Sequence, residues 1–301
     1  MNIIFLQPYF KKTPWANDNL KKMFDLDQDY GEAWLISSIQ GFESKVLNTN
    51  YNLREFILNN PKFFNLKNED ASSFVYPNLT KLLDSKTPLS IQVHPDNEYA
   101  KQFNSLGKNE CWYVLKNSDQ PFILGSKTND INDFKKVMNT KEVENYLNKI
   151  HLENNDFVYI NAGMIHGIPG NTMVFELQQS SDITYRIYDY ERLDINGKKR
   201  DIHIKESLDT IKCNLKPEIQ KQTDNNNFYK TNYFKLQKHE LKNNSIKIST
   251  DLAKHCVELV VLSGNGFIND TPIKSGDVLL ISKNQEEFIL NGTLDLFLSY
   301  V

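Results

Sequence analysis

The sequence predicts a mostly β protein in which a few helices are added to strand-rich units. Apolar runs are short and are separated by turn-forming residues along most of the 301-residue chain. Some of these runs alternate apolar with polar positions, which is the period of a half-buried strand. Aromatic residues make up 12% of the chain and are mostly Phe and Tyr, which suit strands.

The first ninety or so residues mix strand and helix patterns. Residues 31–37 are typical of a strand that follows a turn. Helices are predicted where apolar residues recur three and four positions apart. This spacing occurs at Leu53, Phe56 and Ile57, before Pro61, and again at Leu79, Leu82 and Leu83. In the second of these helices Lys81 would carry a solvated charge.

The stretch at residues 90–96 combines a strand with two candidate metal ligands. Side chains alternate faces along a strand, so Gln92 and His94 lie on one face while the apolar residues between and before them pack on the other. A second apolar strand carries Glu110 at its start, sixteen residues after His94. Three potential ligands therefore converge on one sheet face.

A fourth candidate ligand is His166, in a turn between two predicted strands. Strand patterns cover residues 156–160 before this turn and residues 174–178 after it. Ahead of them, apolar residues at i, i+3, i+4 and i+7 predict an amphipathic helix that rests on the sheet. These residues are Val143, Tyr146, Leu147 and Ile150.

Two imidazole nitrogens, one carboxylate and one amide oxygen suit zinc, and iron, cobalt or manganese can use the same ligands. Such a site is catalytic if positions stay open to water or substrate. The spacing alone leaves a second interpretation open, because a Gln-x-His pair arises easily by chance and a single histidine is more often packed or exposed. The other histidines are assigned structural or surface roles: His151, His203, His239 and His255.

Acidic residues and arginines are dense in the stretch from residue 176 to residue 192. Two interpretations stay open here. Asp182, Arg186, Asp189 and Arg192 form a salt-bridged corner, or Arg186 faces the metal cavity and stabilises negative charge on an oxygen-rich ligand.

The composition shifts after Arg192. Residues 197–200 are predicted to form a charged surface turn, residues 204–212 a short helix, and residues 216–227 a polar linker. The remaining sequence predicts short strands separated by Gly, Asn and Asp turns. We therefore divide the chain into residues 1–215, which carry the candidate ligands, and residues 216–301, an all-β unit. A weak internal repeat relates the two, but the second copy lacks a metal histidine, so a structural β-barrel is expected there.

Composition also narrows the functional class. A net charge of −3 and a pI near 6.1 give no reason to expect nucleic acid as a partner. Three cysteines lie far apart, which disfavours a disulfide framework and favours a reducing compartment. The N-terminus lacks a signal-peptide pattern, and no apolar run approaches the roughly 18 residues that cross a bilayer. We expect a soluble, cytoplasmic protein that does not bind membranes.

Four motifs, in order along the chain, resemble those of the type I mannose-6-phosphate isomerases, in particular the short bacterial form. They are LSIQVHPD at residues 89–96, GKNECWY at 107–113, NAGMIH at 161–166 and QQSSDITYRIYDY at 178–190. The resemblance covers roughly residues 1–215. It implies a cupin-type jelly roll with added helices, followed by a degenerate second barrel. It also implies one bound zinc per chain and interconversion of mannose 6-phosphate with fructose 6-phosphate.

The resemblance also implies roles for single residues. The family's zinc ligands match Gln92, His94, Glu110 and His166. Its active-site arginine matches Arg186, and acidic positions of its site match Glu176 and Asp182. Residues that line its substrate and phosphate pocket are similar to Ser90, Lys81 and Lys108, which makes a pocket role for Lys81 the favoured alternative to a solvated charge.

The expected mechanism is an aldose–ketose isomerisation through a cis-enediol. Zinc would polarise the substrate carbonyl, and Arg186 would add positive charge beside the same oxygens. Glu176 would carry the proton between C1 and C2, with Lys108 as a further catalytic group. Lys81 and Lys108, with Ser90, would anchor the phosphate.

Two other functions fit parts of the pattern. Two histidines and a carboxylate also suit an iron-dependent cupin oxygenase. A sugar-phosphate-binding cupin without catalysis is the second alternative, although Glu110, His166 and Arg186 are all present.

Overall fold

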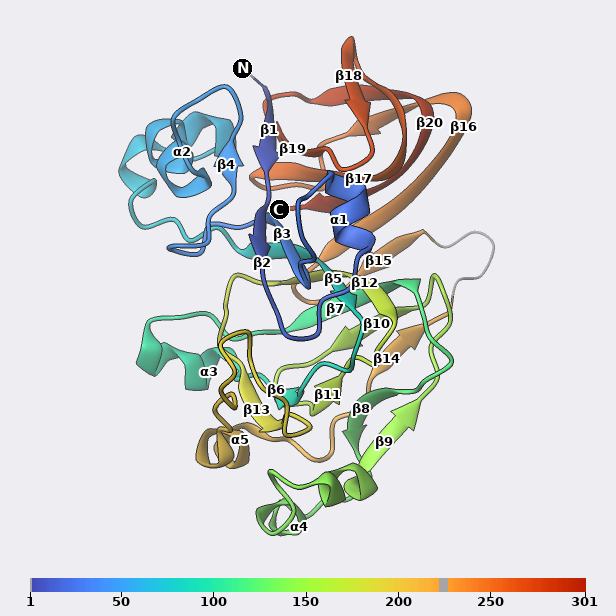
Figure 1. Ribbon diagram of the computed structural model, residues 1–301. Helices are drawn as coiled ribbons and strands as arrows, with labels where there is room; N and C mark the ends of the chain where they lie inside the picture. The colour runs from blue at the N-terminus through green and yellow to red at the C-terminus, as the bar shows by residue number, and fades with distance from the viewer. Residues whose placement is uncertain (1, 222–226) are drawn as a thin grey trace. The chain divides into compact units, whose positions relative to one another are not determined.

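The computed structural model describes residues 2–221 and 227–301. They fall into two compact units. The first contains the described residues of 1–9, 34–79 and 223–301, and the second those of 10–33 and 80–222. Strands dominate both, which confirms the predicted mostly β class (Figure 1).

One eight-stranded sheet forms the framework of the first unit. Its strand order is β15-β16-β20-β17-β19-β1-β4, and β18 pairs with β17. The strands are β1 (Ile3–Gln7), β4 (Lys45–Val46), β15 (Phe228–Lys230), β16 (Lys235–Ser249), β17 (Cys256–Ile268), β18 (Thr271–Lys274), β19 (Val278–Ser282) and β20 (Glu287–Tyr300). The core packs alternate apolar side chains of the long strands, such as Leu259, Leu279 and Leu296.

The C-terminal strands are longer than the sequence predicted. A bulge between Val261 and Ser263 lies inside β17, and β20 continues through Gly292. Both appear as long strands in Figure 1. Gly264 and Gly292 have φ values of +92° and +131°, so each glycine adopts a backbone that other residues disfavour and lets the strand bend instead of ending.

Two further sheets carry the second set of strands. The first has the order β14-β10-β7-β12-β5-β3-β2, and the second the order β13-β6-β11-β8-β9. The strands of the first are β2 (Tyr9–Lys11), β3 (Glu32–Ile36), β5 (Asn78–Ser85), β7 (Glu110–Lys116), β10 (Phe157–Ile160), β12 (Thr172–Gln179) and β14 (Glu218–Gln220). Those of the second are β6 (Ile91–Val93), β8 (Phe122–Ser126), β9 (Leu147–Ile150), β11 (His166–Gly167) and β13 (Tyr185–Tyr188).

Apolar side chains from both of these sheets meet in one core cluster. Trp112, Val158 and Val174 come from the seven-stranded sheet, and Phe122 and Leu124 from the five-stranded sheet. All five are almost completely buried. This two-sheet sandwich fixes β6, β7 and β11 close together.

Helices are short and connect the strands. The α-helices are α1 (Asn19–Phe24), α2 (Leu53–Asn59), α3 (Asn97–Ala100), α4 (Asn132–Lys135) and α5 (Ile204–Thr210). The 3-10 helices are η1 (Pro61–Phe64), η2 (Asn68–Asp70), η3 (Lys101–Phe103) and η4 (Lys141–Tyr146). The predicted helix before Pro61 is confirmed as α2, where Asn52 and Glu55 form a capping box.

Two helix predictions were wrong. The residues around Lys81 form strand β5, all eight of which are buried. A strand buried on both faces has apolar residues on both, so its spacing imitates a helical stripe. The predicted helix over residues 143–150 is instead η4 followed by β9.

The compact units do not coincide with the predicted division at residue 215. Strand β1 is hydrogen-bonded to β19, which brings the N-terminus into the C-terminal sheet. As a statement about independently folding domains, the division stays a prediction. The predicted linker at 216–227 includes β14, and its residues 222–226 lie outside the described residues.

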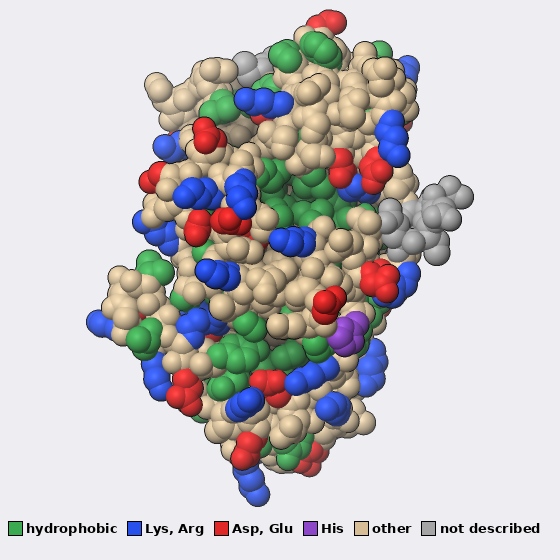
Figure 2. All heavy atoms as spheres, turned by 45° about the vertical axis from the view of Figure 1, so that its right-hand side comes forward, with side chains coloured by type: hydrophobic (Ala, Val, Ile, Leu, Met, Phe, Trp, Pro, Cys, Tyr) green, Lys and Arg blue, Asp and Glu red, His purple; other side chains and the backbone are tan. Residues whose placement is uncertain are grey.

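On the face drawn in Figure 2, Lys and Arg side chains are interspersed with Asp and Glu. Across residues 2–221 and 227–301, no helix is long and apolar enough to span a membrane.

Candidate active site

Three predicted ligands meet where β6, β7 and β11 come together. His94 directly follows β6, Glu110 begins β7, and His166 begins β11 opposite Gln92 of β6. The Nε2 atoms of His94 and His166 are 3.1 Å apart. The Glu110 carboxylate lies 3.5 Å from His94 Nε2 and 3.4 Å from His166 Nε2. All three side chains are buried.

Hydrogen bonds to the backbone define how the two imidazoles point. Nδ1 of His94 lies 2.9 Å from the Ile183 carbonyl oxygen, and Nδ1 of His166 lies 2.9 Å from that of Met164. A carbonyl oxygen only accepts, so each Nδ1 carries the proton and each Nε2 presents a lone pair to the site. Burial lowers the pKa of His94 well below its usual value and that of His166 to about 4. Both rings are therefore neutral near pH 7.

The Glu110 carboxylate is a buried acceptor as well. Its oxygens lie near both imidazoles and the Lys108 ammonium. Burial raises the pKa of Glu110 to about 7, although the ammoniums of Lys108 and Lys81 act in the opposite direction. The Lys108 ammonium lies 3.2 Å from Glu110 Oε2 and 2.9 Å from His94 Nε2.

The Nε2 lone pairs of the two histidines and the buried Glu110 carboxylate form a donor set that can bind a divalent metal ion. The ligand atoms of His94, Glu110 and His166 all lie within 4.8 Å of one another. Two imidazole nitrogens and one carboxylate oxygen suit zinc with an open position. The residues therefore fit the metal that the sequence resemblance implies.

Gln92 extends the site along β6. Its Nε2 lies 3.4 Å from His166 Nε2, while its Oε1 accepts a hydrogen bond of 3.2 Å from the Ser90 hydroxyl. A metal ligand must present the oxygen, so coordination by Gln92 requires a half-turn of the amide, which is nearly symmetric in shape.

A buried ion-pair cluster adjoins the metal ligands. Lys81 of β5 lies 3.2 Å from Glu176 Oε1 and 3.7 Å from Glu32 Oε2. The indole of Trp112 donates a 3.0 Å hydrogen bond to the other oxygen of Glu176. Burial opposes ionisation of Glu176, but the ammoniums of Lys81 and Lys108 outweigh it and lower the pKa of this carboxyl. The interpretation of Lys81 as a solvated charge was wrong, because its side chain is buried.

A cavity of about 410 Å³ opens beside these residues. Its walls include every predicted catalytic and substrate-binding residue, and one predicted metal ligand: Arg186, Glu176, Lys108, Ser90, Lys81, Asp182 and Gln92. Asp182 is the most exposed of them and lies 3.7 Å from Lys11. The cavity wall thus combines one predicted metal ligand, Gln92, with the buried ion pair of Lys81 and Glu176.

The arginine-rich stretch forms part of the predicted salt-bridged corner, with Asp189 and Arg192 but without Asp182, which pairs with Lys11. Asp189 accepts hydrogen bonds from Arg192 and Arg200, which makes a salt-bridged corner. Arg186 takes no part in this corner and lines the cavity. Burial and the neighbouring Arg200 lower the pKa of Arg186, but a guanidinium stays protonated at neutral pH.

Sequence reasoning missed several residues of the cavity wall. Arg200 was predicted in a charged surface turn, yet it lines the cavity together with Lys11, Lys12 and Thr184. The sequence carries no specific signal for Arg200: Arg186 and Asp189 are three residues apart, as are Arg200 and His203. This spacing is too common to predict that the two segments pair.

Known proteins with similar sequence and structure share one activity in their names. Residues 11–128 match the family described as phosphomannose isomerase type I, catalytic domain. The probable mannose-6-phosphate isomerase GmuF of Bacillus subtilis is 31% identical, over 99% of this chain and 98% of that one. The crystal structure of the mannose 6-phosphate isomerase from Bacillus subtilis superimposes with a TM-score of 0.88 and 29% identity over 100% of both chains.

A more distant structure shares the fold alone. It is a mannose 6-phosphate isomerase bound with zinc and yttrium, with a TM-score of 0.76 and 15% identity over 100% of this chain and 99% of that one. These likenesses confirm the cupin-type architecture expected from the sequence motifs. In the described residues the sheets stay open at their edges and do not close into complete barrels.

Proposed function

We propose that this chain, which belongs to the type I phosphomannose isomerase family, interconverts mannose 6-phosphate and fructose 6-phosphate with one zinc ion at His94, Glu110 and His166. The observation that carries this proposal is the convergence of three buried acceptors beside a cavity lined by cationic side chains. The relative that was crystallised with zinc supports the choice of metal. Gln92 is the proposed fourth ligand, through its Oε1.

The isomerisation moves hydrogen between C1 and C2 of the sugar through a proposed cis-enediol. A metal ion held by these ligands supplies Lewis-acid polarisation of the carbonyl and stabilises negative charge on its oxygen. Arg186 adds a second positive charge there. It is paired with Gln92 across β13 and β6, so their side chains leave the sheet on the same face.

Glu176 is the proposed carrier of the proton between the two carbons. The Lys81 ion pair and the Trp112 hydrogen bond fix its carboxylate at the cavity wall. Its lowered pKa keeps it ionised at neutral pH and therefore able to accept a proton. Lys108 faces the same reacting end and is proposed to donate to the substrate oxygens.

The remaining proposed contacts are with the sugar. Ser90 and Asp182 line the cavity and offer a hydroxyl and a carboxylate to the substrate hydroxyls. Lys81 is proposed to act indirectly, because its ion pair holds the Glu176 carboxylate in place. The ammoniums of Lys81 and Lys108 are already engaged by carboxylates and a histidine, so we do not assign the phosphate to them.

Replacing Glu176 by Gln is expected to lower kcat by roughly 100- to 10,000-fold, the usual contribution of general acid–base catalysis. Metal content is expected to stay unchanged, because Glu176 is not a ligand. The measurement is kcat together with uptake of solvent deuterium into the sugar. Glu32→Gln is the matched comparison, because it removes a carboxylate from the same lysine, and a loss below about 10-fold is expected. Equal losses in the two variants would assign Glu176 an electrostatic role only.

The experiment that tests the function follows mannose 6-phosphate by NMR after addition of the purified, metal-loaded protein. Appearance of fructose 6-phosphate is expected. Binding without conversion would support a non-catalytic sugar-phosphate-binding cupin. Oxygen consumption in the presence of iron, without isomerisation, would support a cupin oxygenase.

A further inference from the structure

Two pairs of contacts close residues 186–203 into a hairpin. The Arg186 backbone N–H donates to His203 Nδ1 at 3.1 Å, and the His203 N–H donates to the Arg186 carbonyl at 2.9 Å. Further along, Arg200 donates to Asp189 from Nε at 2.7 Å and from Nη2 at 2.6 Å. Beyond these two contacts, Leu193 and Lys199 form an antiparallel bridge.

Asp189 holds this hairpin against the cavity wall. It is buried, and it also accepts a 2.6 Å hydrogen bond from Arg192. Arg192 in turn donates to the Pro88 carbonyl at 2.6 Å, just ahead of the strand that carries Gln92. A bidentate carboxylate fixes the plane of a guanidinium. Arg200 is therefore held in one orientation.

The cationic side chains of the cavity differ in how fully carboxylates neutralise their charge. Lys81 and Lys108 are buried against Glu176, Glu32 and Glu110. Arg192 and Arg200 share the single carboxylate of Asp189, so these three side chains together keep one net positive charge. Arg200 and Asp189 lie close enough to Arg186 to act on its charge. The carboxylate of Asp194, which also lines the cavity, accepts two backbone N–H groups of its own loop. A ligand dianion would relieve the repulsion between Arg186 and Arg200.

We propose that Arg200 binds the phosphoryl group of the substrate, with Asp189 as the positioning residue that orients its guanidinium. The inference rests on the proposed function, since it names the anchor for the phosphate of that substrate. The Asp189 carboxylate accepts hydrogen bonds from Nε and Nη2 of Arg200. Among the described residues, Nη1 of Arg200 makes no hydrogen bond. Arginine suits this task, because its planar donors match phosphate oxygens.

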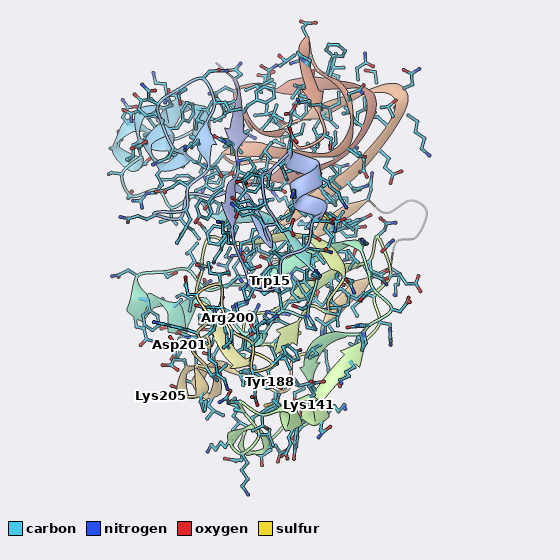
Figure 3. All side chains as sticks on the ribbon, viewed as in Figure 1. Trp15, Lys141, Tyr188, Arg200, Asp201 and Lys205 are labelled. Carbon is cyan, nitrogen blue, oxygen red and sulfur yellow. The ribbon has the colours of Figure 1, made fainter. Side chains whose placement is uncertain are left out.

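Arg200 lines the same cavity as the proposed catalytic residues Arg186, Glu176 and Lys108. Arg200 and Trp15 lie near each other in Figure 3, and both line the cavity. Lys11 and Lys12 line it as well. Arg186 pairs with Gln92 of β6, whereas Arg200 lies on the arm of the hairpin that returns to β13.

The test compares Arg200→Ala and Arg200→Lys with the wild-type chain. KM for mannose 6-phosphate and the inhibition constant of inorganic phosphate are measured for each. Loss of a charge-assisted contact is expected to raise both constants roughly 10- to 100-fold in Arg200→Ala, and less in Arg200→Lys. The kcat is expected to change little, because Arg200 is proposed to bind the phosphoryl group and not the reacting carbons.

Lys205→Ala is the matched control, since it removes one positive charge from the exposed face of α5, away from Arg200 in Figure 3. Its constants are expected to equal those of the wild type. Unchanged KM and phosphate inhibition in a folded Arg200→Ala would overturn the inference while leaving the isomerase activity intact. Should Arg200→Ala unfold, an unchanged Arg200→Lys has the same meaning.

The inference also has a readout that does not need turnover. Binding of inorganic phosphate, measured by calorimetry, is expected to weaken in Arg200→Ala even if the wild-type chain fails to convert mannose 6-phosphate. Inactivity of the wild type would sink the proposed function, and phosphate binding that ignores Arg200 would sink the inference. The two failures are therefore distinguishable.

Discussion

His166→Ala is expected to lose tight metal binding, with a fall in zinc affinity greater than roughly 100-fold. His166 presents Nε2 to the site, because its Nδ1 proton is held by the Met164 carbonyl. Alanine removes one of the three converging ligand atoms, so that His94 and Glu110 alone remain to hold the cation. Isomerase activity is expected to fall with metal content. The measurement is elemental analysis of the purified variant, followed by zinc titration against a chromophoric chelator.

His151→Ala is the matched control for this variant. His151 is exposed and lies outside the metal cluster, so its removal is expected to leave zinc content and activity unchanged. A thermal unfolding curve establishes that His166→Ala is folded before its zinc affinity is compared. A folded His166→Ala with wild-type zinc affinity would remove this histidine from the metal site.

Arg186→Ala is expected to keep its metal and lose turnover, with kcat lower by about 100- to 1,000-fold. Arg186 lines the cavity and pairs with Gln92, but it contributes no ligand atom. Its charge is proposed to act on the oxygens that become negative in the transition state, so its loss lowers kcat more than it raises KM. Steady-state kinetics and zinc content, measured on the same sample, separate these effects.

Arg186→Lys serves as the comparison, because it keeps the charge but not the planar set of donors. It is expected to recover part of the lost kcat. The contrast with Arg200→Ala is equally informative, because that variant is expected to change KM and leave kcat nearly intact. Normal kinetics in Arg186→Ala would exclude this residue from catalysis.

The metal cluster could be predicted because its residues lie on strands with a simple period. Gln92 and His94 share a face through alternation, and Glu110 begins the next apolar run. His166 was harder to place, since its turn has no period of its own. The structure brings it into the site through pairing of β11 with β6, a contact between residues more than seventy positions apart.

Other features were hidden by tertiary effects. Lys81 lies on a strand that is buried on both faces, so apolar spacing suggested a helix and a solvated charge. Burial reverses that interpretation, because a buried ammonium requires the carboxylate of Glu176. Arg200 was overlooked because it follows an exposed, charged loop. Residue 203 pairs with residue 186, and this tertiary contact brings Arg200 to the cavity.

The most direct test of the zinc-dependent mechanism is a coupled isomerase assay before chelation, after chelation and after zinc is restored. We predict that activity disappears when the metal is removed and returns in proportion to added zinc, reaching its maximum at one ion per chain. The chelated protein should stay folded, because the two sheets pack through an apolar core outside the ligands. Full activity in protein shown to contain no metal would contradict the mechanism.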